Sequence, residues 1–187
     1  MEQSLSCSFF GHRYTDITDE LKQKVKDLVE DLIVRHNVTS FLFGSNSDFD
    51  YLCRVVVTEL KEIYPHIKRV HYTCKSEYCI LETEREKLEK SMSLVKKCEV
   101  HLIGMEEEVE HKTKYTAGRL SYVERNRAMI DDSDYCIFYY DKNYKPEMRR
   151  YSKRHIGFYW PKSGTAQAYV YALQKKRVVI NVNCLKS

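Results

Sequence analysis

The chain has 187 residues, of which 43% are hydrophobic and 31% charged, and its formal net charge is +4. This length fits one domain with a single core, and the composition excludes an intrinsically disordered chain. No apolar run reaches the roughly 20 residues that cross a bilayer, and the N-terminus lacks the basic and apolar stretches of a signal peptide. We therefore expect a cytoplasmic globular protein without membrane contact.

The seven cysteines are odd in number and scattered along the chain. The closest pair, Cys74 and Cys79, lacks the two-residue spacing that is usual for metal ligands. We interpret the cysteines as reduced thiols and expect neither a metal site nor a cofactor.

Short apolar runs alternate with helical patterns along the chain. The predicted strands and helices, in order, are strand 5–10, helix 18–33, strand 38–43, a helix that ends at residue 64 before a proline, strand 68–72, helix 82–97, strand 100–103, helix 117–130, strand 135–140, helix 166–174 and strand 178–182. The strands are apolar on both faces, which is typical of a parallel sheet covered on both sides. The pattern predicts one α/β domain over residues 1–187, with a Rossmann-like, doubly wound, mostly parallel sheet flanked by helices on both faces.

Ligands of such folds bind beyond the carboxyl ends of the strands, so the residues after each strand are the candidates. Gly11, His12 and Arg13 follow the first strand. A glycine allows close approach of the backbone to a ligand, and an arginine holds a phosphate or carboxylate through two hydrogen bonds. The alternative is an ordinary turn with a surface arginine.

A small polar loop follows the second strand and leads directly into a helix. It begins with Gly44 and Ser45, and its backbone N–H groups and helix end favour an anion. Asp48 or Asp50 is a candidate acceptor for ribose hydroxyls. The alternative is that Ser47 or Asp48 only caps the helix.

Two further groups of polar residues lie near the later strands. Ahead of the strand at 135–140, Arg125 and Asn126 lie about one helical turn before the inward-packing Met129 and Ile130 and are expected to point toward the end of the sheet. Ser163, Gly164 and Thr165 begin the last helix, where a glycine and two hydroxyls favour an anion-binding turn. The spacing does not match a Walker loop, which argues against a nucleoside triphosphatase.

The segment 142–162 contains seven basic residues and one acidic residue, mixed with aromatic side chains. It exceeds the usual length of a strand-to-helix loop, so we expect a loop or hairpin that covers the site as a lid. Its aromatic rings could stack on a base, and its cations could bind phosphates or pair with acids on a second subunit in a homo-oligomer. The alternative is a solvated hairpin.

Taken in order, Phe10-Gly11-His12-Arg13, Arg125-Asn126-Arg127-Ala128-Met129 and Ser163-Gly164-Thr165 resemble the SLOG superfamily. This group contains the LOG phosphoribohydrolases, the DprA/Smf proteins and small YpsA-like proteins, and the chain is most similar to the YpsA-like branch. The resemblance implies a nucleotide-derived ligand over seven residues: Gly11, Arg13, Gly44, Arg125, Asn126, Gly164 and Thr165.

One departure from the LOG enzymes concerns catalysis. Those enzymes carry a glutamate three residues after the threonine of the glycine turn, where this chain has Ala168. Without that carboxylate, N-glycosidic hydrolysis lacks an evident group to stabilise the oxocarbenium charge or activate water, so we name no catalytic residue. Ligand binding or sensing is therefore the first hypothesis, and hydrolysis or transfer at the N-glycosidic bond of nucleoside monophosphates is the second. A nucleic-acid-associated, DprA-like protein is the third, because the mild net charge disfavours nucleic acid as the partner.

Overall fold

The computed structural model describes residues 4–44, 47–74, 107–111, 119–150 and 157–184. Its principal elements are β1 (Leu5–Gly11), α1 (Asp19–His36), β2 (Val38–Phe43), α2 (Asp48–Ile63), β3 (Lys68–Cys74), β4 (Glu107–His111), α4 (Arg119–Asp131), β5 (Tyr135–Tyr139), α5 (Gly164–Gln174) and β8 (Val178–Asn181). None of the helices in these described ranges is long and apolar enough to cross a membrane.

The described strands form a six-stranded sheet in the order β4-β3-β2-β1-β5-β8, and every neighbouring pair is parallel. From β1 the chain proceeds outward through β2, β3 and β4, and it then returns to the other side of β1 through β5 and β8. The strand order therefore reverses between β1 and β5. The carboxyl ends of these two strands form the switch point at which doubly wound folds bind ligands.

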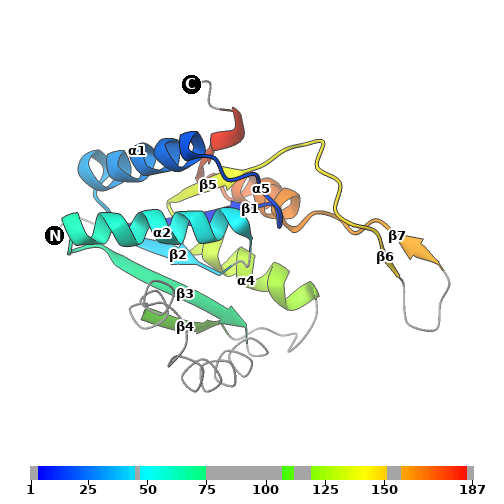
Figure 1. The fold of residues 1–187 in the computed structure, drawn as a ribbon. Helices are drawn as coiled ribbons and strands as arrows, with labels where there is room; N and C mark the ends of the chain where they lie inside the picture. The colour runs from blue at the N-terminus through cyan, green and yellow to red at the C-terminus, as the bar shows by residue number, and fades with distance from the viewer. Residues whose placement is uncertain (1–3, 45–46, 75–106, 112–118, 151–156, 185–187) are drawn as a thin grey trace, which may run out of the picture.

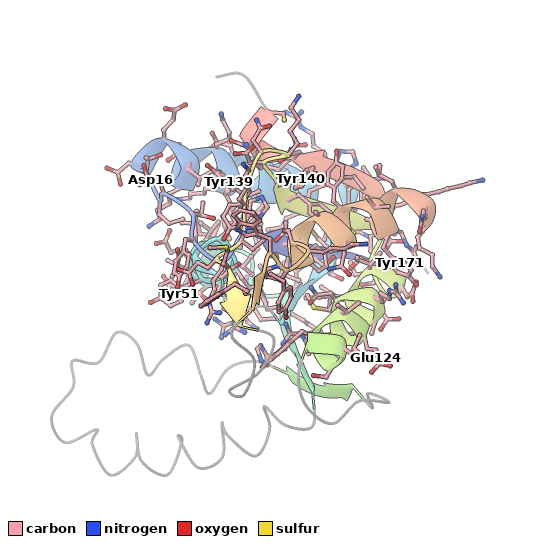
Figure 2. All side chains as sticks on the ribbon, turned by 90° about the vertical axis from the view of Figure 1, so that its right-hand side faces the viewer. Asp16, Tyr51, Glu124, Tyr139, Tyr140 and Tyr171 are labelled. Atoms are coloured by element: carbon pink, nitrogen blue, oxygen red, sulfur yellow. The ribbon has the colours of Figure 1, made fainter. Side chains whose placement is uncertain are left out.

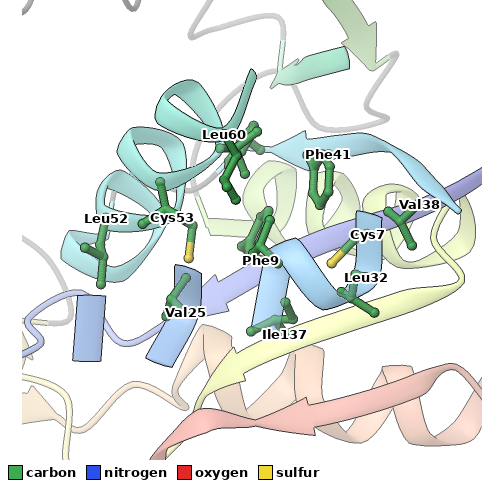
Figure 3. Close-up of a cluster of buried hydrophobic side chains, with 14 of the residues drawn as sticks. Cys7, Phe9, Val25, Leu32, Val38, Phe41, Leu52, Cys53, Leu60 and Ile137 are labelled. Atoms are coloured by element: carbon green, nitrogen blue, oxygen red, sulfur yellow. The ribbon is translucent and has the colours of Figure 1, made fainter. Parts of the chain in front are cut away.

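Alternation of side chains along the strands produces two cores, one on each face of the sheet. Phe9, Phe41 and Ile137 pack against α1 and α2 (Figure 3), whereas Phe10 and Phe138 pack against α4 and α5. Successive residues of a strand point to opposite faces, so a strand that is apolar throughout contributes to both layers. Figure 1 shows α1 and α2 on one side of the sheet and α4 and α5 on the other. The predicted α/β Rossmann-like architecture is confirmed.

A small antiparallel hairpin lies apart from this sheet. It consists of β6 (Arg149–Arg150) and β7 (Phe158–Tyr159), which pair with each other. In Figure 1 it projects from the body of the domain, from the part of the chain between β5 and α5. We refer to residues 142–150 and 157–162 as the arm. The sequence predicted a loop or hairpin at this place.

The structure agrees with most predicted elements and adds one. The predicted helix 82–97 and strand 100–103 lie outside the described residues. The added strand is β4, whose sequence Glu-Glu-Val-Glu-His has a single apolar residue. Within the described sheet it lies at the edge and pairs only with β3, so it tolerates a polar sequence. A search for apolar runs does not detect such a strand.

Candidate functional site

His12 lies at the switch point, directly after β1, and is buried. Its Nε2 lies 3.0 Å from the backbone nitrogen of Asp141, which follows β5, and its Nδ1 lies 3.5 Å from the hydroxyl of Ser163. Its ring stacks on Tyr144 with 3.8 Å between centroids. One imidazole therefore joins the ends of β1 and β5, the start of α5 and the base of the arm.

The Nε2 of His12 lies 3.0 Å from the backbone nitrogen of Asp141 and 3.2 Å from its carbonyl oxygen, so it accepts from the N–H when it is unprotonated and donates to the carbonyl when it is protonated. Its Nδ1 faces the Ser163 hydroxyl, which can donate or accept and therefore fits either neutral tautomer of the ring. Burial lowers the pKa of His12, and the hydrogen bond and charge of Asp141 partly offset this effect. The local structure thus favours a neutral histidine that holds the two strand ends together.

Asn181 at the end of β8 fixes the position of the backbone next to Asp141. Its side-chain oxygen accepts from the backbone N–H of Tyr140 at 3.0 Å, and its amide donates to the carbonyl of Tyr140 at 2.9 Å. The side chain thus continues the pairing of β5 with β8 beyond the last backbone pair. Sequence inspection did not identify this residue, because an asparagine at the end of a strand has no distinctive pattern.

The first turn of α5 faces the same edge of the sheet. Ser163 caps the helix by accepting a hydrogen bond from the Ala166 N–H at 3.2 Å, and the Thr165 hydroxyl donates to the Gly11 carbonyl at 2.7 Å. Thr165 is buried, whereas Gly164 is exposed and a β-carbon added to it would meet no atom within 4 Å. The positive end of the α5 dipole therefore lies beside β1, with its glycine accessible from outside.

The loop after β1 is joined to the start of α2. The Asp48 N–H donates to the Arg13 carbonyl at 3.3 Å, and the Asp48 carboxylate accepts from the Thr15 N–H at 3.0 Å. Gly11 permits this approach, since a β-carbon there would lie 2.4 Å from the β-carbon of Phe49. The Arg13 side chain remains exposed. Burial and the charge of Glu147 raise the pKa of Tyr144, and the charge of nearby Arg13 partly offsets this rise.

Gly44 and Arg125 come together although they are 81 positions apart in the sequence. A β-carbon on Gly44 would lie 2.7 Å from the Met129 sulfur and 3.1 Å from the Arg125 Nε. Arg125 is buried on α4, with its guanidinium over the ring of Tyr122. The absence of a side chain at position 44 therefore provides the space in which α4 packs against the end of β2.

Asn126 extends this group toward α5. It lines the same small hollow as Gly164, between α4 and α5, and its side-chain oxygen lies 3.5 Å from the terminal nitrogen of Arg125. The candidate residues of the β2 end and of the α5 start are thus neighbours. Figure 2 views the molecule with the carboxyl ends of the strands toward the reader; it labels Tyr139 and Tyr140 at the end of β5 and Tyr171 on α5.

A buried carboxylate and two partly buried titratable groups from α2 and β3 lie near the end of β2. Asp50 of α2 is buried, and its carboxylate lies 3.3 Å from the Nε of Arg54. The guanidinium of Arg54 also contacts His71 of β3. Burial, followed by the charges of Arg54 and Arg125, lowers the pKa of His71 to about 3. Sequence reasoning did not single out Arg54 or His71.

The structure therefore places ten of the eleven candidate residues at or near one edge of the sheet, and Ser45 lies outside the described residues. Contacts of His12, Ser163 and Thr165 link the end of β1 with α5, and Arg125 links the end of β2 with α4. Arg13 is held by α2, Gly164 is open to the outside, and Asp50 is enclosed beside Arg54. Ser47 accepts from the Asp50 N–H at 3.1 Å and caps α2, as the alternative interpretation of this loop expected. On the first turn of α2, Asp48 is the exposed carboxylate.

Fold and site together define a Rossmann-like α/β protein with polar loops gathered at the switch point of a parallel sheet. The model of the YspA SLOG family, named YpsA, matches residues 8–163. Since this match covers most of the chain, the protein belongs to the SLOG family, in its YpsA branch, as its motifs indicated. No curated protein shows significant similarity to the chain.

Proposed function

We propose that this protein binds a nucleotide or nucleotide-derived phosphate ligand at the carboxyl ends of β1 and β5, as a binding or sensing protein. The observation that carries the proposal is the position of the α5 N-terminus. Its accessible Gly164 lies next to Ser163, which contacts His12 at the switch point. Helix N-termini favour anions through the dipole and the N–H groups of the first turn.

Arg13 supplies the charge that this proposal needs. It is exposed, and its backbone is held by the start of α2 and so directs the side chain from a fixed loop. A guanidinium binds phosphate through two parallel hydrogen bonds, which a neutral or flexible group does not reproduce. Membership of the SLOG family independently favours a nucleotide-related ligand.

Replacement of Arg13 tests the proposal. We expect Arg13→Ala to lose about 1.5 to 3 kcal/mol of binding free energy for AMP, the value of a charged hydrogen bond, which is about 10- to 150-fold in Kd. The measurement is calorimetric titration with AMP. The control is Arg35→Ala on the exposed end of α1, where the arginine pairs with Asp31 and lies outside the site. Equal AMP affinity in the parent and in Arg13→Ala would reject the assignment.

Hydrolysis or transfer at an N-glycosidic bond is the second candidate, because the SLOG family includes the LOG enzymes. Position 168 does not favour it, since Ala168 is buried in the core between α5 and the sheet and carries no carboxylate. The AMP samples of the titration should therefore contain no released adenine. Glu124, next to Arg125 on α4, is a nearby carboxylate that could substitute for the missing one. Release of adenine that disappears in Glu124→Gln would make the hydrolase the leading function.

A further inference from the structure

A groove of about 750 Å³ runs along the outer face of α5, next to the proposed phosphate site. One wall is α5 itself, with Val170 and Tyr171, and the other is the base of the arm, with Tyr144 and Trp160. Small-molecule pockets commonly have volumes of about 300 to 1,000 Å³. The groove is therefore large enough for a ligand of nucleotide size.

The walls of the groove expose large apolar side chains. Trp160 is 65% exposed and Val170 is 52% exposed, although both are of types that fold into cores. Pro146 and Pro161 lie beside them and limit the backbone freedom of the arm where it forms the wall. A planar apolar group in the groove would remove this surface from water.

The charges on the groove determine what kind of planar group fits. Arg127, Lys145 and Lys162 also line it. Arg127 lies over the ring of Tyr171 at 5.1 Å, which fixes one cation on the wall. The arm is strongly basic, so a second copy of the chain that brought its own arm to this surface would meet like charge. An aromatic ligand with negative charge matches both the apolar wall and the cations.

The groove is continuous with the switch point. Ser163 lines the groove and also contacts His12, and Tyr144 lines the groove while its ring stacks on His12. A ligand whose phosphate lies at the first turn of α5 would therefore extend directly into the groove. Val170 follows Ser163 by about 10 Å along the helix, at 1.5 Å per residue.

We propose that this groove is the base-binding subsite of the protein, in which the aromatic base of a nucleotide stacks on Trp160 while its phosphate lies at the α5 N-terminus. This inference rests on the proposed function and makes it more specific. It assigns selectivity for base-bearing ligands over sugar phosphates to the arm. Trp160 is the residue that recognises the base, because its ring offers the largest flat surface on the exposed wall.

Trp160 is the only tryptophan of the chain, so intrinsic fluorescence reports directly on the groove. We expect AMP to change this fluorescence in a saturable way, and ribose 5-phosphate to bind by calorimetry without changing it. Trp160→Ala should weaken AMP binding about 5- to 150-fold, the range for loss of one base–aromatic stack, and leave the affinity for ribose 5-phosphate unchanged. Trp160→Phe should restore most of the AMP affinity.

Phe158→Ala is the matched control, since Phe158 is an exposed aromatic residue of the arm that does not line the groove. It should leave AMP affinity unchanged. Unchanged AMP affinity in Trp160→Ala, or an equal loss for ribose 5-phosphate, would overturn the subsite while the proposed function stands. Failure of both AMP and ribose 5-phosphate to bind the parent protein would reject the proposed function itself.

Two other occupants of the groove give distinct results. A dimer in light scattering that dissociates in Trp160→Ala would identify the groove as an interface between copies and overturn the subsite. Short single-stranded oligonucleotides that bind far more tightly than AMP, with steep salt dependence, would replace the mononucleotide by a nucleic acid.

Discussion

Three glycines at the carboxyl edge of the sheet differ in what surrounds them. Gly11 and Gly44 lie against other parts of the protein, namely Phe49 for the first and Met129 with Arg125 for the second. Around Gly164 there is open space. The first two glycines are therefore needed for packing between elements, whereas packing does not explain the third. Close approach of a ligand to the start of α5 is the role that our proposal gives to Gly164.

Substitution by alanine separates these roles. Gly44→Ala should lower the free energy of unfolding by about 1 to 3 kcal/mol, because the new methyl group overpacks a buried site. Gly164→Ala should leave stability unchanged or raise it by about 0.5 to 1 kcal/mol, since alanine is the better helix residue, yet weaken AMP binding. Urea unfolding and calorimetry measure the two effects. Intact AMP affinity in Gly164→Ala would contradict a ligand role for this glycine.

At the scale of elements, α5 is held to the sheet by few polar contacts. The hydrogen bond from Thr165 to the Gly11 carbonyl joins its first turn to the end of β1, and small residues such as Ala168 and Ala172 let the helix lie close to the sheet. The position of the proposed anion site relative to β1 therefore depends on this hydroxyl, together with the longer contact of Ser163 with His12. The arm begins and ends next to this turn, so the groove depends on the same anchor.

Thr165→Val removes this hydrogen bond and keeps the shape of the side chain. We expect a loss of about 0.5 to 1.5 kcal/mol in stability, the net value of one hydrogen bond, together with weaker AMP binding. Thr18→Ala is the control, because it removes the N-cap of α1 at a cost of about 1 kcal/mol without touching α5. Both variants should have a lower melting temperature than the parent protein, but AMP affinity should fall in Thr165→Val alone. An equal fall in both would mean that stability, and not the anchor, controls binding.

At the scale of the whole molecule, the partly buried His71 couples folding to pH. His71 has a pKa of about 3 in the folded protein because of burial and the charges of Arg54 and Arg125, against about 6.5 in an unfolded chain. Between these values the unfolded state binds more protons, so stability rises with pH in this window. The contribution is fully present above pH 6.5 and is lost as the pH falls toward 3, by at most about 1.4 kcal/mol for each pH unit.

Urea unfolding at a series of pH values tests this coupling. Below pH 6.5, we expect the free energy of unfolding to fall less steeply with decreasing pH in His71→Gln than in the parent protein. This difference in slope does not depend on how much stability the variant loses at neutral pH. His66→Gln, which changes an exposed histidine in the turn before β3, should retain the slope of the parent. If the free energy of unfolding fell equally steeply below pH 6.5 in the parent and in His71→Gln, other groups, such as the carboxylates, would dominate acid unfolding.

The sequence predicted the sheet well where strands are buried on both faces. Tyr135–Tyr139 is apolar throughout, and Val38–Phe43 is apolar except for Thr39 and Ser40. The caps Thr18 and Ser163 precede helices whose starts agree with the predicted starts within two residues. The order of motifs, from Gly11 to Thr165, also indicated the family. These features are local, since hydrophobic period and capping depend on neighbouring residues of the chain.

Contacts between distant parts of the chain could not be obtained in this way. The His12–Asp141 hydrogen bond, the packing of Arg125 against Gly44 and the groove beside Trp160 each join residues from different elements. Their existence depends on strand order and on helix position, which no local pattern encodes. The same holds for the pKa of His71, because burial and neighbouring charge exist only after folding. The sequence by itself thus determined the α/β architecture, the family and the edge of the sheet to consider, while the tertiary structure alone decided which side chains meet there.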